Sequence, residues 1–194
     1  MSALEIRRQL VHLLYGPAIV VLYYTHLLTL PILFGIIIGG SVMSFMIKRQ
    51  KLGLVRRVLS LFERDHHMET FPGRGVLFFT IGAFLALLLF QETIAYASIL
   101  ILSVGDAATN IAGRYFGKIK TRVHPDKTME GTLIGILVSV PVAYFFVPHF
   151  FAALSASCIA MFLEMPSIRL FGFEIDDNLL VPLGASVTLS LFTV

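Results

Sequence analysis

Charge and cysteine are both scarce in this chain of 194 residues. The single cysteine, Cys158, lies in an apolar run, which excludes an internal disulfide and a cysteine-based zinc site. Only 14% of the residues are charged, whereas soluble domains have about 25%. Hydrophobic residues make up 57% of the chain, and the mean hydropathy is +0.85. The composition therefore excludes an ordinary soluble domain and indicates an integral membrane protein.

Apolar runs separated by short polar stretches predict the transmembrane helices. Several are shorter than the ~20 residues of a typical span, which leaves room for tilted, broken or re-entrant segments. We expect one all-α, polytopic domain over residues 1–194 with about seven transmembrane helices. The first run is expected to be a retained helix and not a removable signal peptide. The seven runs cover residues 8–25, 27–47, 76–91, 94–113, 131–147, 149–164 and 178–194.

All fifteen Lys and Arg residues fall in regions that a seven-span topology places on one side of the membrane. These regions are the N-terminus and residues 48–75, 114–130 and 165–177. Because basic loops tend to stay in the cytoplasm, we expect this multi-pass membrane protein to place its basic regions, and the active site beside them, on the cytoplasmic side. The net charge of +3 thus indicates contact with anionic headgroups or phosphates rather than with nucleic acid.

The segment from Gly105 to Gly131 brings polar residues into the membrane region. A spanning helix that begins at Ile94 must carry Asp106 about 10 Å inside one membrane face, where an ionisable group is costly and usually functional. Asp106, Asn110 and Arg114 are spaced i, i+4, i+8, which predicts one polar stripe on a helix. A structural ion pair between Asp106 and a base such as Arg114 is the alternative.

A basic stretch follows this stripe. Its charge is sufficient to neutralise a triphosphate, and anchoring to anionic lipid is the alternative. GRYFGK is not a Walker A loop, because its spacing is one residue short and it follows a membrane helix. Gly113 and Gly117 match GxxxG, which is typical of helix packing. The cations are Arg114, Lys118, Lys120, Arg122 and Lys127.

Acidic and capping residues complete the set of site candidates. Thr128 and Glu130 lie where a helix N-terminus favours an anion, although Thr128 is also a candidate for an ordinary N-cap. Asp126 and Glu130 are candidates to join Asp106 around a divalent metal, because such ions take carboxylates together with phosphates and water. The other candidates, for which helix packing or an interfacial position is the alternative, are His12, Glu164, Glu174, Asp176, Asp177 and Asn178.

Residues 48–64 predict an interfacial amphipathic helix. Leu52, Val55, Leu59 and Phe62 fall near one helical face, and basic residues cover much of the rest. We expect this helix to lie on the membrane surface. Admitting or covering a lipid is a second hypothesis.

Two stretches, GDAATNIAGRYFGK and HPDKTMEGT, resemble the signature of the CTP-dependent lipid kinases and of phosphatidate cytidylyltransferase. The shared pattern is D-A-x5-G-R-x2-G-K followed by K-T-x-E-G. These kinases include dolichol kinase, phytol kinase and yeast-type diacylglycerol kinase. EIRRQLVH resembles their opening E-x-x-R-K-x-x-H, with Gln9 in place of Lys, and DNLLVP resembles their D-N-x-x-x-P. The cytidylyltransferase's C-terminal H-G-G and D-R-x-D element is absent from the sequence, which favours a kinase.

The resemblance implies transfer of the γ-phosphate of CTP to the hydroxyl of a membrane lipid alcohol. The substrate would be dolichol, phytol, geranylgeraniol or diacylglycerol. A cytidylyltransferase that forms a CDP-lipid, and a non-enzymatic protein that binds or flips lipid headgroups, are the alternatives. We expect Mg²⁺ or another divalent cation at Asp106 with Glu130 or Asp177, although Asp106 is also a candidate base. The implied catalytic residues are Asp106, Asn110, Lys127 and Glu130, and the implied nucleotide contacts are Arg114, Gly117, Lys118, Lys120, Thr128 and Gly131.

Overall fold

The computed structural model describes residues 2–49, 52–121, 124, 127–166, 168–170 and 173–193. At residues 169, 170, 173 and 174 the description is of the backbone alone. The sequence-based predictions for Arg122 and Asp126, and for the side chain of Glu174, therefore lie outside the described residues.

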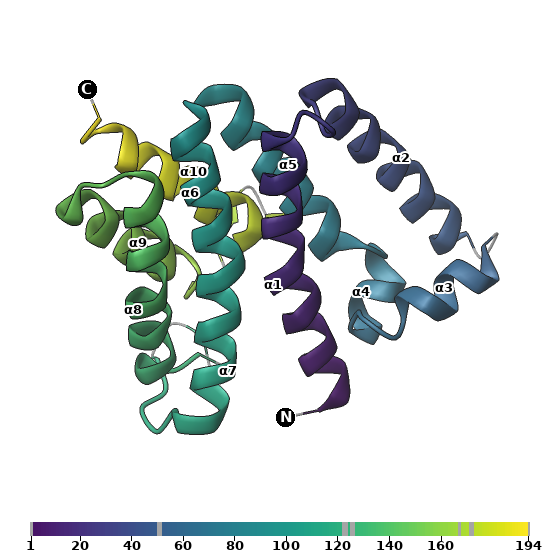
Figure 1. Ribbon diagram of the computed structural model, residues 1–194. Helices are drawn as coiled ribbons and strands as arrows, with labels where there is room; N and C mark the ends of the chain where they lie inside the picture. Colours follow the sequence, from purple (N-terminus) through teal and green to yellow (C-terminus); the bar gives the residue numbers. More distant parts are fainter. Residues whose placement is uncertain are drawn as a thin grey trace.

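The described chain is helical apart from one short hairpin (Figure 1). Its strands, β1 (Arg169–Leu170) and β2 (Phe173–Glu174), are antiparallel, with Arg169 opposite Glu174. The helices are α1 (Ala3–Tyr24), α2 (Leu30–Lys48), α3 (Gly53–Leu59), α4 (Asp65–Thr70), α5 (Arg74–Leu89), α6 (Glu92–Leu100), α7 (Asp106–Phe116), α8 (Met129–Phe146), α9 (Phe150–Leu163) and α10 (Asp177–Ser190), with a π-helical segment η1 (Ile101–Gly105) between α6 and α7.

Three helical segments are long and apolar enough to cross a membrane. They are Leu30–Lys48, Glu92–Phe116 and Met129–Phe146. Arg74–Leu89 and Phe150–Leu163 are shorter apolar helices. Each of the seven predicted apolar runs contains a helix, which confirms a helical membrane protein, while the number of crossings stays a prediction.

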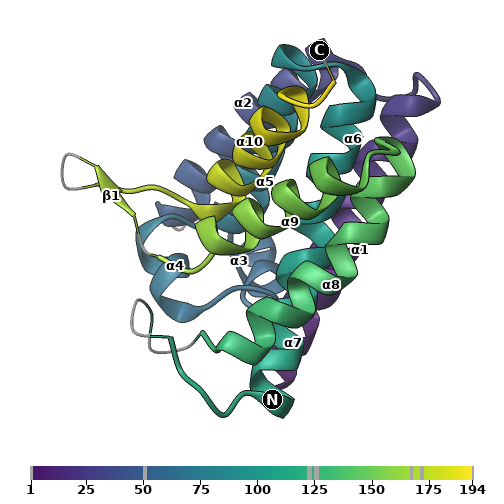
Figure 2. The same cartoon turned by 90° about the vertical axis from the view of Figure 1, so that its left-hand side faces the viewer.

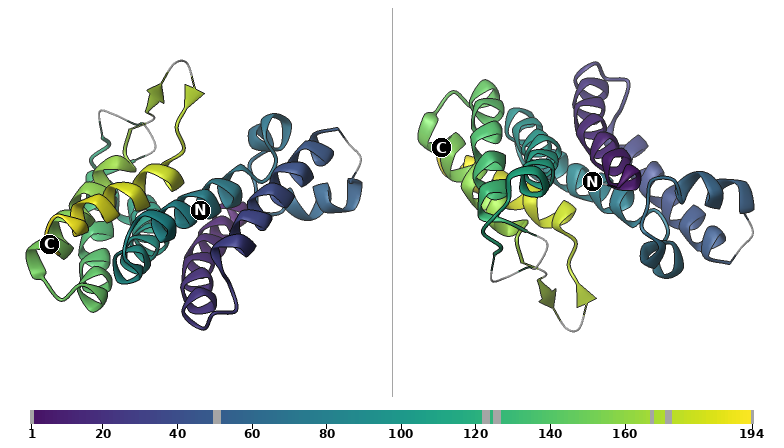
Figure 3. Two further views of the ribbon diagram at one scale, coloured as in Figure 1. Left: turned by 90° about the horizontal axis from the view of Figure 1, so that it is seen from above. Right: turned by 90° about the horizontal axis from the view of Figure 1, so that it is seen from below.

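The helices form an elongated row rather than a closed ring (Figure 3). In the views from above and below, α8 and α9 lie on one side of α6, and α2 lies with α3 and α4 on the other. Alanines such as Ala83, Ala95, Ala153 and Ala185 are fully buried in the core. Small side chains let neighbouring helix backbones approach closely, which is the usual way helices pack in a membrane.

The π-helical segment interrupts the long polar-ended span directly before Asp106. The hydroxyl of Ser103 donates to the carbonyl oxygens of His12, at 2.7 Å, and Leu13, at 3.1 Å, which ties this segment to α1. Single-turn π segments inside α-helices are often found at functional sites. Here the segment sets His12 and Asp106 on facing helices.

The amphipathic helix predicted over residues 48–64 is wrong in extent. Lys48 ends α2, and α3 covers only Gly53–Leu59. The chain then turns at Leu61 and Phe62, and Glu63 accepts a hydrogen bond from the backbone N–H of Gly73 at 2.5 Å. Gly73 has φ +80°, a left-handed conformation that glycine adopts readily. This contact ties the segment after α3 to the residue that precedes α5, which local amphipathicity does not reveal.

Basic connections gather at one end of the molecule. Figure 1 places the N-terminus, the end of α7, the start of α8 and helices α3 and α4 toward the same end, with the C-terminus at the opposite end. Figure 2 shows the hairpin strand β1 projecting from the side of the bundle, on the side where α4 lies. This end of the bundle carries the candidate site.

Candidate active site

A pocket at this end of the bundle brings together most of the polar residues predicted from the sequence. The cavity has a volume of about 390 Å³ and lies among α1, α5, α7, the start of α10 and the segments that precede α4, α8 and α10. The predicted residues that line it are His12, Asp106, Asn110, Arg114, Lys127, Glu164, Asp176, Asp177 and Asn178.

Lys127 lies at the centre of an inner cluster formed with His12, Asp106, Asn110 and Glu164. Its ammonium group donates to Glu164 Oε1 and, at 3.3 Å, to Asn110 Oδ1, and it lies 3.8 Å from Asp106 Oδ1. Asn110 Nδ2 donates to Asp106 Oδ1 at 2.6 Å, and His12 Nε2 lies 3.4 Å from Asp106 Oδ2. The cluster therefore joins the predicted stripe on α7 to side chains from three other segments.

The chain around Lys127 folds back toward α7 to place this side chain. Thr121 N donates to the carbonyl of Lys127 at 2.9 Å, and Met129 N donates to the carbonyl of Ile119 at 2.9 Å. Thr128 then caps α8, because its hydroxyl accepts from Gly131 N at 3.2 Å. The cap begins α8 immediately after Lys127, so the lysine occupies a defined position at the pocket wall.

Burial acts on the charges of the inner cluster. Burial lowers the pKa of Lys127, but the carboxyl groups of Glu164 and Asp106 outweigh it and raise that pKa overall. The raised pKa is consistent with one cationic lysine shared by two carboxyl groups. Removing one member of such a buried ion pair strongly lowers the stability of the fold.

The start of α10 supplies a second acidic wall. Asp176 is the N-cap of this helix, and its carboxylate accepts from Arg74 Nε at 2.8 Å and from Asn178 Nδ2 at 2.7 Å. The neighbouring Asp177 lines the pocket and accepts from Asn178 N at 2.9 Å. Asp176 therefore orders the turn, whereas Asp177 stands where a ligand in the pocket can reach it.

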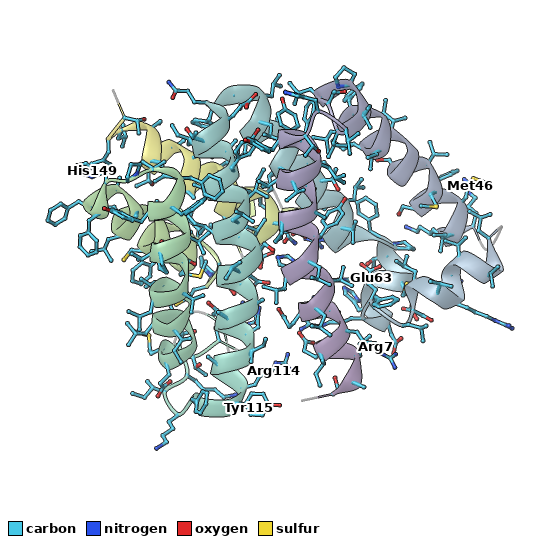
Figure 4. The ribbon with its side chains drawn as sticks, viewed as in Figure 1. Arg7, Met46, Glu63, Arg114, Tyr115 and His149 are labelled. Atoms are coloured by element: carbon cyan, nitrogen blue, oxygen red, sulfur yellow. The ribbon has the colours of Figure 1, made fainter. Side chains whose placement is uncertain are left out.

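An outer cluster of three arginines and one glutamate lines the other end of the pocket. Glu5 is 5% exposed and lies 3.2 Å from Arg8, 3.4 Å from Arg64 and 3.2 Å from Arg114. Figure 4 shows Arg114 reaching from α7 toward α1 and Glu63 lying between α1 and α4. Three separate segments thus converge on one carboxylate.

Several predicted contacts lie outside the residues that line the pocket. Lys118 and Lys120 are exposed, and Glu130 accepts from Ile119 N at 3.1 and 3.2 Å. A Cβ atom added to Gly131 would meet the carbonyl oxygen of Thr109 at 2.6 Å, so this glycine allows close packing of α7 on α8. Gly117 ends α7 beside Thr128. The nucleotide-binding roles of Gly117, Lys118, Lys120, Thr128 and Gly131, and the catalytic and metal-binding role of Glu130, stay predictions.

Sequence reasoning missed several charged residues of the pocket. Glu5 and Arg8 belong to the EIRRQLVH stretch, whose resemblance to the kinases' opening was a usable signal. Glu63, Arg64 and Arg74 also line the pocket. The first two lie in the 48–64 stretch, which was predicted only as a surface helix, and Arg74 lies in the basic loop after it. Their position depends on the turn between α3 and α5.

Among the described residues, no three His, Cys, Asp or Glu side chains are placed to hold a metal ion. Mg²⁺ in phosphate-binding sites is typically held by one or two carboxylates together with phosphate oxygens and water. Asp106 and Asp177 fit that smaller requirement, because both line the cavity.

Comparison with known proteins adds to this geometry. An uncharacterized protein of Methanocaldococcus jannaschii is 32% identical over 181 residues, which cover 92% of this chain and 88% of the relative. The chain belongs to the same family as this archaeal protein. No family model matches the sequence, and no solved structure matches it.

Two fungal enzymes are more distant relatives. CTP-dependent diacylglycerol kinase 1 of Schizosaccharomyces pombe is 26% identical over 154 residues, covering 71% of this chain and 68% of the kinase. The enzyme of the same name from Eremothecium gossypii is 29% identical over 99 residues, covering 51% of this chain and 31% of the kinase. The predicted relationship to CTP-dependent lipid kinases is confirmed at this level, without a preference for dolichol or phytol.

Proposed function

We propose that this protein is a membrane-embedded, CTP-dependent lipid kinase. The observation that carries the proposal is the pocket in which Asp106, Asn110 and Lys127 from the two signature stretches meet a group of arginines. Phosphoryl transfer needs charge neutralisation and alignment more than covalent chemistry by the protein, and these residues suit both needs. The names of the two fungal relatives support the same reaction class.

In the proposed reaction, the lipid hydroxyl oxygen attacks the γ-phosphorus of CTP. A bond forms between this oxygen and the γ-phosphorus, the bond from the γ-phosphorus to the β–γ bridging oxygen breaks, and CDP leaves with the bond's electron pair. The hydroxyl proton passes to Asp106, whose carboxylate is oriented by Asn110 at 2.6 Å. Lys127 neutralises charge on the transferred phosphoryl group. A divalent cation held by Asp177 and the phosphate oxygens would supply further charge neutralisation.

The pocket wall toward the middle of the bundle suits a lipid alcohol. His12 and Tyr15 pack edge-on against Phe79, with ring centroids 4.9 and 5.3 Å apart. Tyr15 also shares a 2.8 Å hydrogen bond with Thr80. Val11, Val76 and Phe62 add apolar side chains to the pocket lining. A lipid is therefore able to present its hydroxyl to Asp106 while its chain stays among apolar side chains.

The substrate and the orientation belong to the same proposal. The candidate alcohols are diacylglycerol, dolichol, phytol and geranylgeraniol. The pocket is proposed to face the cytoplasm, where CTP is available, because every Lys and Arg falls in regions that the seven-span topology assigns to that side.

Position-specific labelling of CTP tests this function. Purified protein would be incubated with each lipid alcohol and with CTP labelled at the γ- or the α-phosphate. We expect γ-label on a lipid alcohol and unlabelled lipid in the α-label reaction. Transfer of α-label with release of pyrophosphate would establish a cytidylyltransferase instead. Headgroup binding with transfer of neither label would favour a non-enzymatic protein.

A further inference from the structure

The outer cluster holds more positive charge than its one carboxylate requires. Three guanidinium groups surround Glu5, so the cluster carries a net charge of +2. A single arginine is enough to pair with a carboxylate, and the planar guanidinium fork matches phosphate oxygens equally well. The excess charge faces the cavity, because Glu5, Arg8, Arg64 and Arg114 all line it.

The position of the outer cluster along α1 connects it to the inner cluster. Glu5, Arg8 and His12 are spaced so that they share one face of this helix, and all three line the pocket. At 1.5 Å per residue, Arg8 lies about 6 Å and Glu5 about 10 Å along the helix axis from His12. His12 contacts Asp106, the proposed proton acceptor. Glu5 and Arg8 thus lie further along the same face of α1 from the inner cluster.

Arg64 differs from the other two arginines in its origin and exposure. Arg8 and Arg114 belong to the stretches that resemble the lipid kinases, whereas Arg64 comes from the turn between α3 and α4. Its side chain is half exposed, at 50%. Arg64 directly precedes α4, which lies on the other side of α1 from α7 (Figure 1). It is thus the arginine that is freest to exchange the Glu5 carboxylate for an incoming anion.

We propose that Arg64 binds the α- and β-phosphates of CTP together with Arg8 and Arg114, so that the γ-phosphate is left at Lys127. This assignment rests on the proposed function for the identity of the nucleotide. Arg64 thus gives the triphosphate a cationic contact from outside all the stretches that resemble the lipid kinases. The exposed Lys118 and Lys120, which the sequence favoured for this role, lie outside the pocket lining.

The test measures equilibrium binding of CTP to purified protein in detergent, alongside KM values for CTP and for the lipid. Arg64→Ala is expected to weaken CTP binding roughly ten- to a hundredfold and to leave the KM for lipid unchanged, because a charge-assisted hydrogen bond is lost. Arg64→Lys should fall between, because it keeps the charge and loses the fork. Arg57→Ala, an exposed arginine on α3 outside the pocket lining, is the matched control and should bind CTP as the wild type does.

A double-mutant cycle with Glu5→Gln separates phosphate binding from simple neutralisation of Glu5. If Arg64 only balances the charge of Glu5, its removal will cost nothing in CTP affinity once Glu5 is neutral. If Arg64 contacts the phosphates, the loss will persist in the Glu5→Gln background. The first result would overturn the inference, and the second would support it.

The inference and the proposed function fail in different ways. If the wild type transfers the γ-phosphate and the Arg64→Ala variant binds CTP normally, the kinase function is supported and the role of Arg64 is overturned. CTP binding that depends on Arg64, without transfer to any lipid, would keep the binding site and overturn the kinase. A wild-type protein that does not bind CTP would overturn both.

Discussion

The two ends of the pocket use charge in different ways. In the inner cluster, the side chains of Lys127, Asp106 and Glu164 are 13%, 13% and 1% exposed, and one cation is shared by two carboxyl groups. In the outer cluster, the side chains of Arg8, Arg64 and Arg114 are 27%, 50% and 37% exposed, and three cations share one carboxylate. The inner end is suited to hold reacting groups in fixed positions, and the outer end to exchange a charged nucleotide in every turnover.

The largest difference between the two ends of the pocket is expected when Asp106 is neutralised. Asp106→Asn keeps the size of the side chain and removes the carboxylate that we propose accepts the proton. Turnover should fall by about 10²- to 10⁴-fold, the usual value of a general base, while CTP binding at the outer end persists. The measurement is γ-phosphate transfer beside equilibrium CTP binding. Normal turnover in a folded, extractable variant would remove Asp106 from the mechanism.

Lys127→Met tests whether the inner end depends on its shared cation. Removing the lysine leaves two buried carboxyl groups without their partner, so the free energy of unfolding should fall by about 3–5 kcal/mol. Turnover should fall as well, because we propose that Lys127 neutralises charge on the transferred phosphoryl group. Thermal unfolding in detergent measures the first effect. Lys118→Met, at an exposed position, is the control, and equal losses in both variants would contradict a special role for Lys127.

Glu63 tests the segment that carries Arg64. Burial raises the pKa of Glu63 above its usual value of 4.5, so the Glu63 carboxyl group binds its proton more tightly in the folded protein than in the unfolded chain. This contribution to stability is complete below about pH 4.5 and is lost as the pH rises through the raised pKa. Glu63→Gln should therefore flatten the decline in Tm as the pH increases from 4.5. Asp65→Asn, at an exposed position, should leave the dependence of Tm on pH as in the wild type. An unaltered pH dependence in Glu63→Gln would show that ionisation of Glu63 does not destabilise the fold.

The smallest effect is expected outside the pocket. Substituting both Lys118 and Lys120 with Ala should change the KM for CTP by less than about twofold, because exposed charges far from a ligand are screened by salt. The same KM assay used for Arg64→Ala gives a direct comparison. A larger loss than in Arg64→Ala would restore the sequence-based assignment of these lysines and break the contrast between pocket and loop.

The helices and part of the site were predictable because they depend on local patterns. Apolar runs indicated the helical segments, and the i, i+4 spacing of Asp106 and Asn110 predicted their contact on α7. Lys127 and Glu164 were identified as candidates by their type and position near the same membrane face. Their contact depends on how the chain folds back before α8 and on where α9 ends.

The α3–α4 region could not be predicted in the same way. Its composition indicates a surface helix over residues 48–64, yet α3 ends at Leu59, and the Glu63–Gly73 hydrogen bond closes the loop in which Arg64 lies. Arg64 and Arg74 both line the pocket. A hydrogen bond between residues ten positions apart, one of them a glycine with positive φ, leaves no periodic signal in the sequence.

The sequence by itself determined a helical membrane protein with its basic residues in a few loops and an acidic stripe at Asp106, because hydropathy and helical periodicity are local properties. Only the tertiary structure decided which cations reach that stripe. It placed Lys127 and the arginines at Glu5 in the pocket and left Lys118 and Lys120 exposed. The physical reason is that charge composition is additive along a chain, whereas a binding site depends on which side chains converge in space.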